Sequence, residues 1–170
     1  MRGGTPGGAL DPVFAWIEES AFSDWLRSSS SLFAFPGVLV LHAWGMGFLA
    51  GTGAMLSLRA LGAARQIPYA ALTRFFPIVW IALAVNGVSG VLLLIAYPTK
   101  ALTNPLFYAK LILIAAALTM TVRLRDCAPP SGEAKRLAVL TLVLWTAAIF
   151  AGRFLAYTHT RLLVDTPAYF

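Results

Sequence analysis

The stretch LFAFPGVLVLHAWGMGFLAGTGAMLSL, residues 32–58, decides the fold class of this chain. It carries no formally charged side chain and a single titratable group, His42. About 20 apolar residues are enough for a helix to cross a hydrocarbon layer ~30 Å thick, so this run can span a membrane with residues to spare. Three further apolar runs follow it, at about 75–97, 106–122 and 137–157. The sequence therefore predicts four membrane-spanning helices.

Composition and charge support the same class. Of the 170 residues, 59% are hydrophobic and 12% are charged, whereas roughly a quarter of the residues of a soluble domain are charged. The formal net charge of +6 does not indicate nucleic-acid binding, because the basic residues lie mostly in short loops between the apolar runs. There they set the topology of the helices and do not form a phosphate-binding surface.

The same basic residues predict the orientation in a bacterial inner membrane. Loops 59–74 and 123–136 hold three and four, respectively, of the 13 Lys and Arg residues. The positive-inside rule places both loops in the cytoplasm, and four spans then leave the N- and C-termini on the periplasmic side. With short loops, consecutive spans should pack as antiparallel neighbours. We expect an all-α, up-down four-helix bundle in the lipid bilayer.

An amphipathic segment precedes the first span. Asp11 and Pro12 are typical of a helix start, and apolar residues then recur at helical spacing, namely Phe14, Ile17, Ala21 and Trp25, with Glu18, Glu19 and Asp24 away from that stripe. This pattern predicts a short helix that lies at the membrane surface. It could dock on its own bundle or on a partner subunit. We therefore expect three regions: a tail and interfacial helix at 1–31, the bundle at 32–157, and an outer tail at 158–170.

Three ionisable groups fall inside the predicted spans. His42 lies about nine residues from the outer end of its span, which is ~14 Å at 1.5 Å per residue, while Lys110 and Arg153 lie ~6 Å deep by the same measure. Ionisable groups in a spanning helix are costly and mark candidate functional sites. Lys110 and Arg153 could instead extend to the headgroups. The His42 side chain is too short to reach the headgroups. A hydrogen bond to a neighbour such as Asn86 would explain a histidine at this depth without any ligand.

The residues around His42 suggest room for a ligand. On a helical wheel Gly45, Met46 and Gly53 share the side of His42, and glycines beside a membrane histidine leave a hollow. A ridge of small residues, Ala43, Gly47 and Gly51, lies on the opposite side and would let another helix approach closely. On the second span, Asn86 lines up with Ala82 and Gly90. Ordinary close packing of helices would explain the small residues on both spans equally well, without a ligand.

Three interpretations of this centre remain open. A b-type haem ligated by His42 could pair its propionates with the shallower cations Lys110 and Arg153, but the sixth ligand is missing, because His159 lies about 10 Å shallower. Copper could use His42 and Met46, one turn apart, since imidazole and thioether suit Cu(I). A structural subunit of a larger membrane complex, or a homo-oligomer, would need no cofactor.

The third span opens as FYAKLILIAAAL, at 107–118, and the second reads RFFPIVWIALAVNGVSGVLLLI, at 74–95. With a histidine in the first span, this pattern resembles the superfamily that contains the CopD copper-resistance membrane domain and the HemJ-type protoporphyrinogen oxidases. It is closer still to an uncharacterised bacterial family of small four-helix membrane proteins, over about 12–157. The resemblance implies roles in haem binding and activity for His42 and Lys110 only. We expect a redox or anchor subunit with electron transfer through haem b.

Overall fold

The computed structural model describes residues 11–127 and 129–158, which fold into helices joined by short turns. Four stretches in this part are long and apolar enough to cross a membrane, namely Phe35–Ala60, Tyr69–Ala96, Pro105–Asp126 and Gly132–Tyr157. The first, third and fourth are the single helices α3, α7 and α8, whereas the second contains the short α4 (Tyr69–Thr73) and the long α5 (Phe76–Ala96). The expected all-helical, four-span bundle is confirmed.

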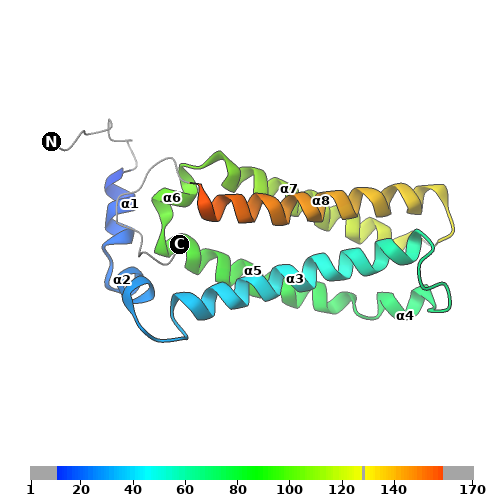
Figure 1. Ribbon diagram of the computed structural model, residues 1–170, viewed down its shortest axis with the longest axis horizontal. Helices are drawn as coiled ribbons and strands as arrows, with labels where there is room; N and C mark the ends of the chain where they lie inside the picture. Colours follow the sequence, from blue (N-terminus) through cyan, green and yellow to red (C-terminus); the bar gives the residue numbers. More distant parts are fainter. Residues whose placement is uncertain (1–10, 128, 159–170) are drawn as a thin grey trace.

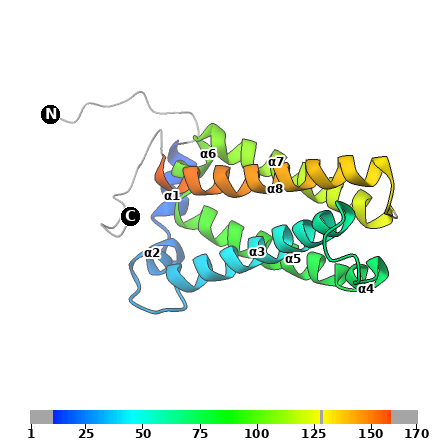
Figure 2. The same ribbon diagram turned by 45° about the vertical axis from the view of Figure 1, so that its right-hand side comes forward.

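The bundle consists of two helical hairpins that lie side by side (Figure 1). In one, α3 packs along α5, and in the other α7 packs along α8. The hairpins meet mainly where α3 contacts α8, while α5 and α7 make little direct contact. The short α1 (Asp11–Glu18), α2 (Ala21–Ser28) and α6 (Pro98–Leu102) cover one end of the bundle, here called the cap end (Figure 2). The opposite end, with α4 and the turn between α7 and α8, is the loop end.

Local sequence signals set the helix starts. A proline stands in the first turn of α3, α5, α6 and α7, where its missing N–H costs no hydrogen bond. Asn104 caps α7 by accepting from the N–H of Leu106, and Ser131 caps α8 by accepting from the N–H of Ala134. These signals explain why each connection turns sharply at a defined residue.

Two of the long helices extend beyond the predicted apolar runs. The run at 106–122 lies in a helix that continues to Asp126, and the last helix begins at Gly132 instead of 137. The basic residues of the predicted loop therefore lie on helix ends. Hydropathy locates the apolar part of a helix but not its ends, because intrahelical hydrogen bonds continue past the hydrocarbon layer.

The surface and the interior have the composition of a membrane protein. Large apolar side chains such as Trp44, Ile81 and Ile112 are 64%, 65% and 69% exposed, an arrangement that suits lipid as the solvent. The interior contacts use many small residues, among them Ala117, Ala138 and Ala148. Small residues let helix backbones approach closely, and close packing is the main source of helix association in lipid.

The predicted interfacial helix is two helices, and its expected inward face is correct for Phe14, which is buried, but wrong for Glu18 and Trp25. The helix is interrupted at Ser20, whose Oγ accepts a hydrogen bond from the N–H of Ser23 and so caps the start of α2. Glu18, expected on the polar side, is buried and accepts from the backbone N–H of Thr99 at 3.1 Å. Trp25, expected on the apolar stripe, is exposed. The break rotates the second helix relative to the first, so a single helical stripe does not describe both.

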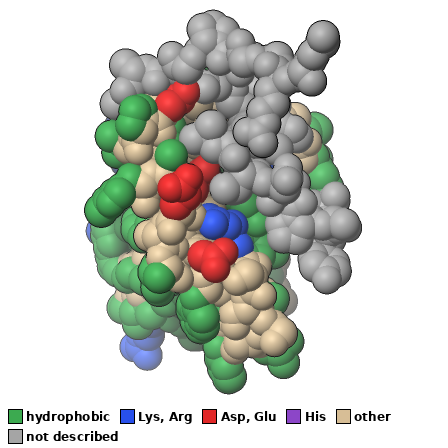
Figure 3. Space-filling model, turned by 90° about the vertical axis from the view of Figure 1, so that its left-hand side faces the viewer, with side chains coloured by type: hydrophobic (Ala, Val, Ile, Leu, Met, Phe, Trp, Pro, Cys, Tyr) green, Lys and Arg blue, Asp and Glu red, His purple; other side chains and the backbone are tan. Residues whose placement is uncertain are grey.

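This segment docks on its own bundle. Packing joins α1 to α6 and α2 to α5. Tyr97 is buried in this interface with Leu26 and Val38. Burial raises the pKa of its hydroxyl, and the nearby Arg27 guanidinium partly offsets that rise. Acidic side chains remain on the outside of the cap end, where Figure 3 shows them separated by a basic group.

The side chain of Arg27 links α1 and α2 to the end of α5 by hydrogen bonds. Its guanidinium donates to the carbonyl oxygens of Ala96, at 2.9 Å, and Glu18, at 2.6 Å, and to Ser23 Oγ at 2.6 Å. Ala96 is the last residue of α5 and Glu18 the last of α1, so one side chain satisfies the free carbonyl groups of two helix ends. The guanidinium also lies 5.9 Å from the centroid of the Tyr97 ring.

We predict that Arg27→Ala lowers the unfolding free energy of the detergent-solubilised protein by about 2 kcal/mol, because it leaves buried carbonyl oxygens without a charged donor. Thermal unfolding followed by circular dichroism measures this change. Arg136→Ala is the matched control, since Arg136 is exposed and its removal should change stability by ~0.5 kcal/mol or less. Equal melting temperatures for the two variants would contradict this role of Arg27.

Candidate functional site

The ring of His42 connects the two hairpins inside the bundle. Its Nδ1 lies 3.2 Å from the carbonyl oxygen of Asn86 and 3.1 Å from Ser89 Oγ, both on α5. Its Nε2 lies 3.1 Å from Lys110 Nζ, on α7. Both ring nitrogens therefore have protein partners, and the partners come from opposite sides of the bundle.

The neighbours of Nδ1 determine which nitrogen carries the proton. The Asn86 carbonyl oxygen can only accept, and the Ser89 hydroxyl donates to the Val85 carbonyl oxygen at 2.6 Å. Nδ1 therefore carries the hydrogen and donates it towards α5. Nε2 then presents its lone pair and accepts a hydrogen bond from the Lys110 amine.

Close approach of α3 and α5 makes this geometry possible. Asn86 Nδ2 donates to the His42 carbonyl oxygen at 2.8 Å, so each residue binds the backbone of the other's helix. A Cβ at Gly45 would lie 2.9 Å from the Asn86 Cβ, and one at Gly90 would lie 3.3 Å from the His42 ring. Glycine at these two positions leaves room for the amide and the imidazole to lie between the helices.

Lys110 turns inwards and does not extend to the headgroups. A Cβ at Gly152, on α8, would lie 3.3 Å from Lys110 Cε and 3.5 Å from its Nζ. The lysine stem thus passes over this glycine to reach Nε2 of His42. The sequence places Lys110 at a shallower depth than His42, and the long stem closes that difference. The His42–Lys110 pair therefore touches all four long helices.

The structure separates the other candidate residues from this pair. Arg153 is exposed, with its guanidinium 4.8 Å from the centroid of the Tyr157 ring. A Cβ at Gly53 would lie 2.5 Å from the Trp145 indole nitrogen, so Trp145 fills the space beside that glycine. Met46 packs against the apolar core. His159 lies outside the described residues. Protein atoms therefore occupy the space expected to be hollow beside Gly45 and Gly53.

Sequence reasoning missed two contributors to the site. Ser89 lies three residues after Asn86 on the same face of α5, so the helical spacing that selected Asn86 could have selected it as well. Gly152 shows its role only in the structure, because it acts by making room for a side chain from another helix. Among the described residues, no three His, Cys, Asp or Glu side chains gather where they could hold a metal ion.

This geometry defines a multi-pass helical membrane protein with a buried imidazole–amine pair. Comparisons of the chain with protein-family models, curated proteins and solved structures gave no match. The resemblance to the CopD and HemJ-type superfamily stays a prediction.

Two glycines on α3 provide a matched test of the α3–α5 contact. Gly45→Ala should lower the unfolding free energy by about 1–3 kcal/mol, because its methyl group would collide with Asn86 and the Ala82 carbonyl. Gly47→Ala meets no atom within 4 Å, so it should be neutral or stabilise the helix by up to about 1 kcal/mol. Chemical or thermal unfolding in detergent measures both. A Gly45→Ala protein as stable as Gly47→Ala would contradict the close contact.

Proposed function

We propose that this chain is a membrane-embedded redox or anchor subunit whose working centre is the His42–Lys110 pair, with b-type haem as its cofactor and His42 as an axial ligand. It resides in a bacterial inner membrane with the cap end on the periplasmic side, where it works with a partner protein. Haem would supply one-electron transfer at this centre.

The observation that carries the proposal is the orientation of the imidazole. Nδ1 is held by the Asn86 carbonyl oxygen at 3.2 Å, which leaves the lone pair of Nε2 facing the bundle interior. A ligating histidine typically donates its second N–H to a backbone carbonyl, since that bond fixes the tautomer and the ring direction. The His42 ring is thus arranged as an axial ligand requires.

The polarity of the site supports the same proposal. His42 and Lys110 are two basic side chains in the apolar part of the bundle, where ionisable groups are costly and usually functional. The pair itself contains no carboxylate. A haem carboxylate would provide the charge-assisted partner that Lys110 lacks within the pair.

Haem binding also makes two demands on the protein. Lys110 must leave Nε2, and its flexible stem allows that movement. The hairpins must make room for the macrocycle, and we place it on the side between α5 and α7 because those helices make little direct contact. The exposed Arg153 is not part of the interior site and would contribute only from the surface.

The absorption spectrum of protein purified from haem-supplied cells tests the proposal. We expect a Soret band in the wild type and its loss in His42→Ala, because the axial ligand is removed. Arg153→Ala serves as a control that removes a cation outside the pair, and it should keep the band. Colourless wild-type protein that also fails to bind added haemin would overturn the haem assignment.

A second candidate function is a cofactor-free structural subunit. It is favoured by the complete set of hydrogen bonds around the imidazole and by the protein atoms that fill the space beside Gly45 and Gly53. In this case the pair serves only to join the α3–α5 and α7–α8 hairpins. For the copper alternative, the described residues hold no group of three His, Cys, Asp or Glu side chains that could bind a metal ion.

Lys110→Met distinguishes the two candidates. If His42 ligates haem, the variant should keep the Soret band but bind haemin more weakly in a titration, because the haem carboxylate loses its charge-assisted partner. If the pair is structural, the variant should stay colourless and lose about 1–3 kcal/mol of stability, because Nε2 is left without a donor in the interior. Leu111→Met is the control, since Leu111 is exposed on the same helix and should change neither property.

A further inference from the structure

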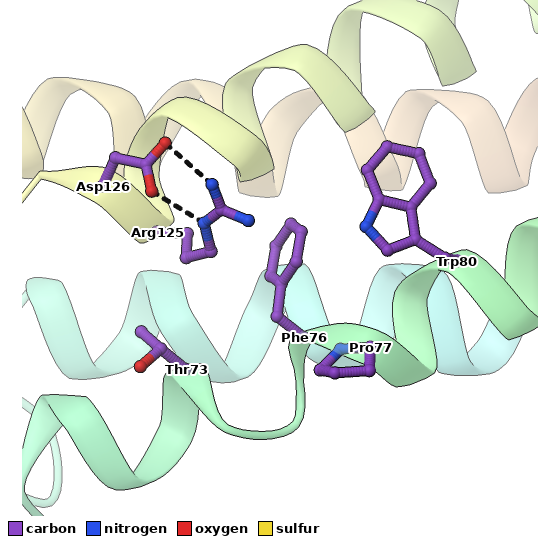
Figure 4. Close-up of a pocket in the computed structure, with 6 residues that line it drawn as sticks. All are labelled: Thr73, Phe76, Pro77, Trp80, Arg125 and Asp126. Carbon is purple, nitrogen blue, oxygen red and sulfur yellow. Dashed lines mark hydrogen bonds and ion pairs between the residues drawn. The ribbon is translucent and has the colours of Figure 1, made fainter.

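A groove at the loop end lies between the start of α5 and the end of α7, away from the His42–Lys110 pair. Its volume is about 430 Å³, and it is lined by Thr73, Phe76, Pro77, Trp80, Arg125 and Asp126. Figure 4 shows Phe76 pointing from α5 toward Arg125 on α7, with Trp80 further along α5. The groove thus combines an aromatic wall from one hairpin with a charged rim from the other.

The charged rim consists of two neighbouring side chains with a fixed geometry. Arg125 Nε lies 2.7 Å from Asp126 Oδ1, and Arg125 Nη2 lies 3.0 Å from Asp126 Oδ2. The guanidinium carbon lies 4.5 Å from the centroid of the Phe76 ring, which restrains the arginine from the other side. A guanidinium has five N–H donors and a carboxylate about four acceptor sites. The ion pair uses only part of both sets, so each group can bind a further partner.

The groove lies at the depth where a lipid headgroup meets its acyl chains. Arg125 and Asp126 are the last two residues of α7, where an apolar span ends. Trp80 lies about one turn further into α5 and is half exposed, which is the usual place of an interfacial tryptophan. An occupant therefore has its polar part beside the ion pair and its apolar part along Trp80.

We propose that this groove binds a phospholipid with a phosphoethanolamine headgroup. The lipid phosphate accepts hydrogen bonds from the free guanidinium edge of Arg125, and the primary ammonium group donates to the outer lone pairs of Asp126. The headgroup dipole then lies antiparallel to the Arg125–Asp126 dipole, and both ends form charge-assisted hydrogen bonds. The acyl chains follow the aromatic wall formed by Phe76 and Trp80.

Charge complementarity selects this headgroup over two common alternatives. A phosphocholine headgroup carries a quaternary ammonium without N–H donors, so it cannot hydrogen-bond to Asp126. A phosphoglycerol headgroup has a net negative charge and no cation, so its hydroxyl groups can donate to Asp126 but cannot form the oppositely charged pair that an ammonium group forms. Phosphoethanolamine satisfies both side chains.

Native mass spectrometry of the detergent-purified protein, titrated with lipids of identical acyl chains, tests this order. We expect phosphatidylethanolamine to bind more tightly than phosphatidylcholine and phosphatidylglycerol, by roughly fivefold, as for a pair of interfacial charges. Equal binding of all three lipids would overturn the proposal, and so would a preference for phosphatidylglycerol, which would indicate a simple anion site.

Two substitutions locate the preference in the groove. Asp126→Asn should abolish the advantage of phosphatidylethanolamine over phosphatidylcholine, and Arg125→Gln should weaken all three lipids. Glu133→Gln and Arg123→Gln are the matched controls, because both residues are exposed near the same end but do not line the groove. Thermal unfolding verifies that each variant is folded. A headgroup preference that survives Asp126→Asn, or disappears equally in the controls, would contradict the assignment.

Discussion

The hydrogen bonds of one imidazole join the two hairpins of this protein inside the bundle, in addition to the packing of α3 on α8. His42 donates to α5 from Nδ1 and accepts from α7 at Nε2, although those two helices make little direct contact with each other. In lipid, apolar side chains gain little by leaving their solvent, so polar contacts and close packing decide which helices associate. The glycines around the ring are therefore part of the same interaction, because they bring the partners within hydrogen-bond reach.

At both ends of the bundle, charged side chains lie where helices begin or end, but they bind different groups. At the cap end, Arg27 and Glu18 bind backbone groups left free where α1, α5 and α6 begin or end. At the loop end, Arg125 and Asp126 mark the limit of the apolar surface and form the polar rim of a groove. Among residues 11–127 and 129–158, these charged side chains lie where helices end, whereas the His42–Lys110 pair lies in the interior.

The sequence predicted the spans and part of the candidate site. The apolar runs identified all four long helices, and depth along the helices singled out His42 and Lys110, which do make contact. Depth did not show that Arg153, at the same depth as Lys110, is exposed and lies apart from the His42–Lys110 pair, since depth says nothing about the direction of a side chain around its helix. The sequence prediction also failed in part at the cap end, where α2 starts anew after Ser20 and buries Ser23 and Leu26 instead of Trp25. Glu18, expected on the polar side, is buried at the end of α1.

The amino-acid sequence by itself determined the solvent, the number of spans and the all-helical fold, because these depend on runs of apolar residues long enough to cross a bilayer. Only the tertiary structure decided that Lys110 binds His42, that Trp145 fills the space beside Gly53, and that Gly152 makes room for a lysine stem. Those contacts join residues from different helices. Helical periodicity describes one helix at a time, so the rotation and spacing of neighbouring helices had to be seen in three dimensions.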